Sequence, residues 1–223
     1  MHVPSLVAVP GLGLGAEAWR PTLSLWGRGD GDVRLLPGYG VPLARAAPWT
    51  PVDIAAQLCG VLRGPTTLLG HSSSCQVVAH AARLRPDLVT GLALVAPTTD
   101  PRAGSWPALM GAWCRTVGHE DPRQLPLLLR QYRRTTLRSM LRTMDRSRRD
   151  DIAATLSQVG CPVVLVRGVH DRIARSDWLR ALADGGPGRT VIELGVGAHM
   201  VPLTHPDVLA AEVGAALGLP TEG

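Results

Sequence analysis

Three side chains that together could carry out acyl transfer follow short apolar runs of this chain. Ser72, Asp171 and His199 each come shortly after such a run. An imidazole can take the proton of a serine hydroxyl, and a carboxylate can orient the imidazole and stabilise its charged form. These residue types therefore predict nucleophilic catalysis, with Ser72 as the nucleophile, His199 as the base and Asp171 as the acid.

The residues around Ser72 fit a tight turn between a strand and a helix. Gly70 and Ser74, two positions before and after Ser72, are both small, and a larger side chain would clash in such a turn. The turn exposes the serine hydroxyl and brings the amide of Ser73 to a helix N-terminus, where it can stabilise an oxyanion. The alternative is a serine-rich loop in which Ser72 only caps the helix.

A glycine-rich loop at 11–15, reading G-L-G-L-G, follows the first apolar run. An oxyanion site needs a second backbone donor from a neighbouring loop, and we predict that this donor is the amide of Leu12. The rival interpretation is a dinucleotide-binding loop with Ala16 at its last position. That fingerprint expects an acidic residue at the end of the next strand, whereas Asp30 and Asp32 precede that strand.

Several other reactive side chains must be weighed against the three. Asp100 follows another apolar run and is the alternative acid, and Cys75 is an alternative nucleophile that we expect to face the core. We expect His71 to point away from the pocket, and His170 and His205 to be loop or cap residues. No His, Cys or Asp cluster has the spacing of a metal site, so we predict neither a metal nor a cofactor.

The elements that must position these residues alternate along the chain. Buried strands are predicted at 5–10, 33–36, 66–69, 92–96, 162–167 and 190–194, and helices at 51–63, 73–85, 176–183 and 206–217. Continuous apolar strands separated by helices predict an α/β fold, a mostly parallel sheet of about six strands with helices on both faces. Ligands bind beyond the carboxyl ends of such strands.

One interval, 97–160, contains no convincing strand, and arginines alternate there with leucines and methionines. This pattern predicts amphipathic helices. We therefore expect an α/β core made of residues 1–97 and 161–223, with residues 98–160 forming a helical cap over one end of the sheet.

Apolar side chains predict the substrate pocket. The expected lining is Leu14, Trp106, Met110, Trp113 and Met200, which favours a small, largely apolar substrate. The cap arginines would attract a carboxylate, a phosphopantetheine arm or an acidic carrier protein, so the substrate could be linked to a carrier protein or to CoA. Alternatively, these arginines form an ordinary solvated face.

Composition excludes several other classes. The chain has 223 residues, four scattered cysteines, a formal charge of +5 and 4% aromatic residues, which argues against a disulfide scaffold and nucleic-acid binding. No apolar run approaches the ~20 residues of a membrane-spanning helix, and glycines and prolines interrupt the apolar N-terminus, unlike a signal peptide. We expect a cytoplasmic monomer or homodimer.

Together, these segments resemble the α/β-hydrolase superfamily, in particular its small, lid-bearing esterases, thioesterases and carbon–carbon bond hydrolases. The resemblance is carried by residues 9–19, 36–40, 70–74, 167–171 and 197–206. It also agrees with the chain order Ser, Asp, His, which differs from that of the other common serine-triad folds. It implies an eight-stranded sheet whose first two strands this chain lacks, leaving about six.

The chain departs from the family pattern at four positions. Pro10 stands where a histidine is often found before the oxyanion glycine, Ser74 and Cys75 replace a glycine pair, and Leu35 replaces an aspartate. A serine at position 72 argues against dehalogenases and epoxide hydrolases, which use a carboxylate.

The resulting functional prediction is a serine hydrolase that cleaves an ester, thioester or similar acyl bond. The alternative is a biosynthetic cyclase or lyase that uses the same triad. In the cyclase an internal nucleophile accepts the acyl group, and in the lyase His199 serves an elimination. A non-enzymatic binding protein on the same scaffold is the third class, and it predicts no labelling of Ser72.

Overall fold

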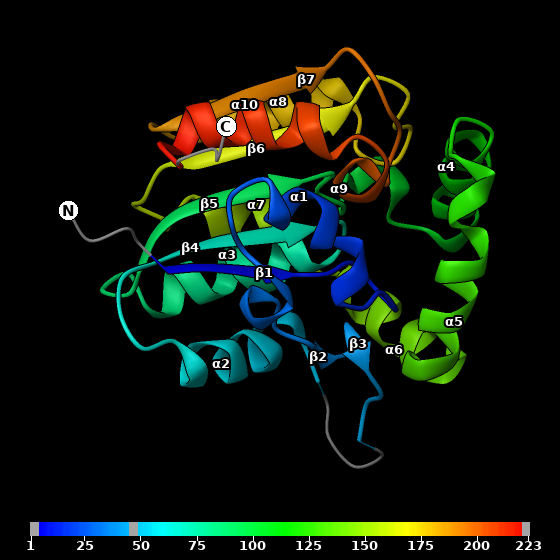
Figure 1. Cartoon of the computed structure of the whole chain (residues 1–223), viewed down its shortest axis with the longest axis horizontal. Coiled ribbons are helices and arrows are strands. Elements are labelled where there is room, and N and C mark those ends of the chain that lie inside the picture. Colours follow the sequence, from blue (N-terminus) through cyan, green and yellow to red (C-terminus); the bar gives the residue numbers. More distant parts are fainter. Residues whose placement is uncertain (1–4, 45–48, 220–223) are drawn as a thin grey trace.

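Five parallel strands form the main sheet of the computed structural model, which describes residues 5–44 and 49–219 (Figure 1). The strands are β1 (Ser5–Val9), β4 (Thr66–His71), β5 (Val89–Val95), β6 (Val163–Gly168) and β7 (Arg189–Leu194), and they lie side by side in this order. Every neighbouring pair is parallel. The chain therefore has the predicted α/β architecture.

Burial along the strands explains their apolar composition. Every residue of β4 and β6 is buried, whereas most residues of β7, at the edge of the sheet, are partly exposed. Leu68, Leu92 and Leu165 on the central strands have no exposed surface. Parallel strands covered on both faces need such continuous apolar sequences.

Helices cover both faces of the sheet. The core helices are α1 (Arg20–Ser24), α2 (Pro51–Val61), α3 (Ser74–Leu84), α7 (Ile152–Leu156), α8 (Ser176–Asp184), α9 (Val201–Thr204) and α10 (Pro206–Leu217). In Figure 1, α1 and α10 lie in front of the sheet, while α3, α7 and α8 lie behind it. The predicted core helices are therefore present, with ends within two residues of those expected.

The strand predicted at 33–36 is wrong as a member of the main sheet, which has five strands in the described residues instead of about six. Val33 forms only an isolated bridge with Ala8. The following residues pair instead in a separate two-stranded sheet of β2 (Leu36–Pro37) and β3 (Gly40–Val41). Pro37 has no amide hydrogen to donate, and Gly38 and Gly40, at φ 84° and 94°, turn the chain.

Three helices lie beyond the carboxyl ends of the strands (Figure 1). They are α4 (Trp106–Val117), α5 (Leu125–Thr135) and α6 (Leu137–Ser147), accompanied by short 3₁₀ turns at Pro101–Ala103 and Pro122–Gln124; two further turns occur at Ala16–Ala18 and Asp30–Asp32. The interval is helical, as expected. The division into core and cap stays a prediction: α7, inside the interval 98–160, packs against α3 of the core.

The cap helices are tied to the core loops by polar contacts. Glu17 accepts hydrogen bonds from Arg130 and Arg134 of α5 at 3.2 and 3.1 Å, and Thr135 donates to the carbonyl of Gly13. Residues 1–4, 45–48 and 220–223 of the predicted core lie outside the described residues. Among the described helices, none is long and apolar enough to cross a membrane.

Candidate active site

Ser72 occupies a strained turn between β4 and α3. Its φ is 58°, a conformation that non-glycine residues rarely adopt, and its amide donates to the carbonyl of Val95 at 2.8 Å. Gly70 lies so close to α3 that a Cβ there would come within 2.9 Å of Cα of Cys75. The small residue before Ser72 is therefore required by packing, as the turn motif predicts.

The structure brings Ser72, His199 and Asp171 together in one hydrogen-bonded chain. Nε2 of His199 lies 2.8 Å from Oγ of Ser72, and Nδ1 of His199 lies 2.8 Å from Oδ2 of Asp171. The amides of Ile173 and Ala174 donate to Oδ1 of Asp171 at 2.8 and 3.0 Å. This is the geometry in which an imidazole can remove the serine proton while a carboxylate fixes its tautomer.

The alternative acid, Asp100, lies elsewhere. It is buried and forms an ion pair with Arg102 of its own loop, which also donates its amide to Asp100. In the described part of the chain it forms no hydrogen bond or ion pair with His199. The geometry therefore favours Asp171 over Asp100 as the partner of the imidazole.

Burial and charge shift the pKa values of the pair. For Asp171 burial alone would raise the pKa, but the neighbouring imidazole and the amides of Ile173 and Ala174 lower it. For His199 burial would lower the pKa, but the charge and hydrogen bond of Asp171, followed by the charge of Glu120, raise it. Asp171 is therefore ionised at neutral pH and stabilises the imidazolium.

The two amides predicted to bind an oxyanion are free to do so. Within the residues that the structure covers, the amides of Leu12 and Ser73 donate to no other group. Leu12 lines the same cavity as Ser72. Its loop is held by the amide of Gly13, which donates to the carbonyl of Gly38 at 2.9 Å. The hydroxyl of Tyr39 donates to the carbonyl of Ser73 at 3.3 Å and so helps to hold the turn that carries the amide of Ser73.

The expectation that His71 points away from the pocket is wrong. Its side chain lines the cavity with Ser72, and its Nε2 donates to the carbonyl of His199 at 2.9 Å. Burial, followed by the charge of His199, lowers its pKa to about 3, so the ring is neutral and Nε2 carries the hydrogen. Gly11 makes room for it, because a Cβ there would lie 2.7 Å from Nδ1 of His71.

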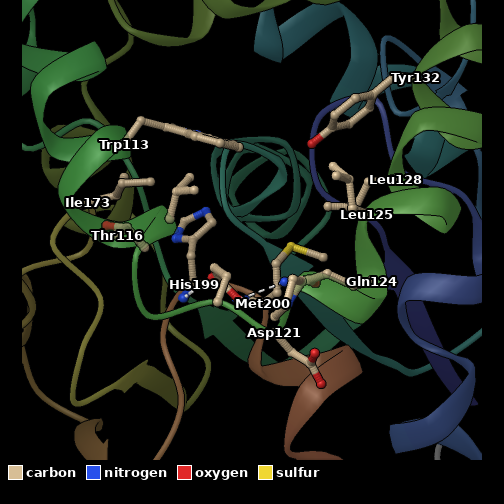
Figure 2. A pocket seen from close by; sticks show the side chains of 13 residues that line it. Trp113, Thr116, Asp121, Gln124, Leu125, Leu128, Tyr132, Ile173, His199 and Met200 are labelled. Carbon is tan, nitrogen blue, oxygen red and sulfur yellow. Dashed lines mark hydrogen bonds between the residues drawn. The ribbon is translucent and has the colours of Figure 1, made fainter.

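Two adjoining cavities meet at His199. The larger, of about 370 Å³, is lined by Ser72 and by all five residues predicted for the pocket, Leu14, Trp106, Met110, Trp113 and Met200. Leucines and methionines of the cap complete its wall. The smaller, of about 210 Å³, is shown in Figure 2 and shares Trp113, Tyr132, His199 and Met200 with the larger.

The remaining predicted residues fall outside this arrangement. Cys75 is fully buried under the turn, where burial raises its pKa well above the usual range. Asp30, which the dinucleotide alternative required, pairs with Arg20 at the surface. The ring of His170 stacks on that of His119, and His205 contacts Thr204. No group of three potential metal-ligating side chains occurs in the described residues.

Glu120 lies in the turn just after α4, and the sequence did not single it out as a functional residue. Its Oε1 accepts the amides of both His199 and Met200, at 2.7 and 2.9 Å, across 79 and 80 residues of sequence. Oε2 accepts from Nε2 of Gln124 at 3.0 Å. A carboxylate of the cap therefore holds the loop that carries the imidazole. No local sequence pattern could have linked these positions.

We expect Glu120→Gln to reduce kcat/KM by about 10- to 100-fold, because a neutral amide oxygen holds the amides of His199 and Met200 less strongly than the carboxylate does. Since the charge of Glu120 raises the pKa of His199, its removal should lower that pKa. Activity requires neutral His199 and falls as pH drops through its pKa, so the acid limb of kcat/KM should move to lower pH. The pH profile measures this shift; an unmoved acid limb would leave Glu120 with only a structural role.

Comparisons with known proteins agree with this geometry. The model of a family described as the alpha/beta hydrolase family matches residues 6–212. Among curated proteins, (E)-2-((N-methylformamido)methylene)succinate hydrolase from Acinetobacter baylyi is 34% identical over 95 residues. That match covers 40% of this chain and only 36% of the relative.

Solved structures share the fold over nearly the whole chain. A hydrolase from Oleispira antarctica superposes with a TM-score of 0.79 at 12% identity, covering 99% of this chain and 93% of the other. An enol-lactonase from Burkholderia xenovorans gives 0.71 at 16% identity, covering 98% and 92%. At such low sequence identities, these structures show that the fold is shared and do not indicate a substrate.

Proposed function

Because the chain belongs to the alpha/beta hydrolase family, we propose that it cleaves an ester, thioester or similar acyl bond through an acyl-enzyme on Ser72. The observation that carries this proposal is the hydrogen-bonded chain from Ser72 through His199 to Asp171 at the wall of an apolar cavity. The chemistry follows from the residue types and their geometry.

In the first step, Oγ of Ser72 forms a bond to the acyl carbon while Nε2 of His199 takes the serine proton. The amides of Leu12 and Ser73 bind the oxyanion, and losing one such donor typically costs ~10²–10³ in kcat. The acyl bond to the leaving group then breaks, and the imidazolium of His199 protonates that group. Water, deprotonated by the same imidazole, attacks the acyl-enzyme. The bond between the acyl carbon and Oγ of Ser72 then breaks, the imidazolium of His199 returns its proton to Oγ, and the acid is released.

The lining of the larger cavity supports a small, largely apolar substrate. Its walls are formed mainly by leucine, methionine and tryptophan side chains from the core loops and from α4 and α6. The cap arginines line neither this cavity nor the smaller one, so they would contact a CoA or carrier-protein group only outside the pocket. Such a linked substrate, the cytoplasmic location and the oligomeric state stay predictions.

A second candidate is a cyclase or lyase that uses the same residues. It is favoured by the limited access of solvent to Ser72, which is 9% exposed and lines a largely apolar cavity. In a cyclase, an internal hydroxyl or amine of the acyl chain would replace water as the acceptor. In a lyase, His199 would act as the base of an elimination.

Hydrolysis of p-nitrophenyl esters from acetate to octanoate in ¹⁸O-labelled water separates these candidates. We expect multiple turnovers, fastest for apolar acyl groups that fill the larger cavity, and one solvent oxygen in each product acid. Covalent labelling of Ser72 by a fluorophosphonate without turnover of any ester would instead favour the cyclase or lyase. A protein that shows no labelling and no turnover would contradict both candidate functions.

A further inference from the structure

The two cavities divide at His199 in a way that assigns them different parts of a substrate. Ser72 and Leu12 line only the larger cavity, whereas Glu120 and Gln124 line only the smaller. The acyl carbon must lie against Ser72 and its oxyanion donors. The leaving group must receive its proton from the ring of His199, which borders both cavities, so the smaller cavity is the natural site for that group.

We propose that the smaller cavity is a leaving-group subsite, an inference that rests on the proposed function. The subsite takes a neutral or cationic group that donates hydrogen bonds, such as an amino or ammonium alcohol, and it rejects carboxylates. Its volume of about 210 Å³ suits a small leaving group.

The charges around the smaller cavity are negative. Glu120 accepts only from uncharged N–H groups, those of His199, Met200 and Gln124, and it has no arginine partner among the described residues. Asp121, the other carboxylate of the lining, pairs with Arg123 at the surface. No arginine lines either cavity. A bound ammonium would therefore meet an uncompensated carboxylate, and a bound carboxylate would meet repulsion.

One residue that lines this cavity also has a buried acceptor without a partner. Gln124 is 9% exposed, and its Oε1 has no hydrogen-bond partner within the described chain. Because Nε2 of Gln124 donates to the carboxylate of Glu120, which can only accept, the amide cannot flip to hide its oxygen. A buried acceptor without a donor is unfavourable, and a substrate donor that reached this oxygen would relieve the cost.

Aromatic side chains border the same space. Figure 2 shows Trp113 at the upper left and Tyr132 at the upper right of the cavity, with the hydroxyl of Tyr132 directed toward its interior. That hydroxyl has no partner in the described residues. Burial and then the charge of Glu120 raise the pKa of Tyr132, so the phenol stays neutral. Neutral aromatic rings beside a carboxylate are a favourable environment for an ammonium group.

Three butyrate esters that differ only in the leaving group test the proposal. 3-Aminopropyl butyrate carries an ammonium group, butyl butyrate is its neutral isostere, and 2-carboxyethyl butyrate carries an anion. We expect kcat/KM for the cation to be about tenfold above that of the neutral ester, and for the anion at least about tenfold below it. An anionic ester cleaved as well as the neutral one would overturn the subsite.

The cation-to-neutral ratio of kcat/KM in Glu120→Gln identifies the source of the selectivity. Effects of this change on His199 act on both esters alike and cancel in the ratio, which should fall toward one. Glu212→Gln, which removes the same charge from the exposed side of α10, is the matched control and should keep the ratio. A ratio that survives in Glu120→Gln would contradict the proposal.

The failure of the subsite can be told apart from failure of the proposed function. Turnover of p-nitrophenyl butyrate reports the acyl-transfer chemistry with a leaving group that needs little protonation. Turnover of this ester without the expected charge order would remove only the subsite. No turnover of any of the four esters, with Ser72 unlabelled, would remove the proposed function, and the subsite with it.

Discussion

Ser72→Ala is expected to lower kcat by about 10⁵- to 10⁶-fold, the usual cost of removing a triad nucleophile. The hydroxyl has no substitute at this place. Cys75, the nearest alternative, is fully buried and its Sγ faces the carbonyl of Val95. Steady-state kinetics with a p-nitrophenyl ester would measure the loss. Cys75→Ala is the comparison and is expected to retain activity within about tenfold, because burial keeps the thiol of Cys75 protonated and so unreactive.

The same position allows a stability test of the strained turn. Ser72 adopts φ 58°, which costs non-glycine residues about 1 kcal/mol or more. Ser72→Gly should therefore be as inactive as Ser72→Ala but more stable by about 1 kcal/mol. Denaturant unfolding of the two variants measures this difference. Activity that survives in both would show that the reaction does not pass through this hydroxyl.

Asp171→Asn is the second large effect, with an expected loss of about 10⁴-fold in kcat. The amides of Ile173 and Ala174 donate to Oδ1 of Asp171, so they would hold the carbonyl oxygen of the new asparagine. Its NH₂ group would then face Nδ1 of His199 and force that nitrogen to accept. Nε2 would carry the hydrogen and could no longer take the proton of Ser72.

Asp100→Asn is the matched control, since it removes one carboxylate that also follows a strand of the sheet. Asp100 accepts hydrogen bonds from Arg102 and forms no hydrogen bond or ion pair with the triad in the described residues. We expect kcat within a few-fold of the unmodified protein, with any loss confined to stability. A larger loss in Asp100→Asn than in Asp171→Asn would transfer the role of the acid to Asp100.

The positions that the sequence predicted well are those determined by local pattern. Apolar runs predicted all five strands of the main sheet, and small residues at 70 and 74 predicted the turn at Ser72. The prediction for residues 33–36 failed because their apolar pattern suits a strand of the main sheet. The proline and glycines that follow direct the chain into a separate two-stranded sheet instead. A short apolar run cannot show which partner it will find.

Contacts between segments that are distant in the chain could not be predicted from the sequence. The choice between Asp171 and Asp100 depends on which strand end His199 reaches, because both residues follow strands. His71 turned out to line the cavity because Gly11, about sixty positions away in the chain, leaves space for its ring. Glu120 and Gln124 belong to an ordinary polar stretch of the cap, and only the folded chain brings them beside the imidazole.

The central claim is that the hydroxyl of residue 72 is activated for attack on an acyl carbon. Labelling of the intact protein with a fluorophosphonate, followed by intact-mass measurement and peptide mapping, tests it most directly. We expect a single adduct per chain, on Ser72, and none in Ser72→Ala or His199→Ala. An unlabelled protein, or an adduct on another residue that persists in Ser72→Ala, would contradict it.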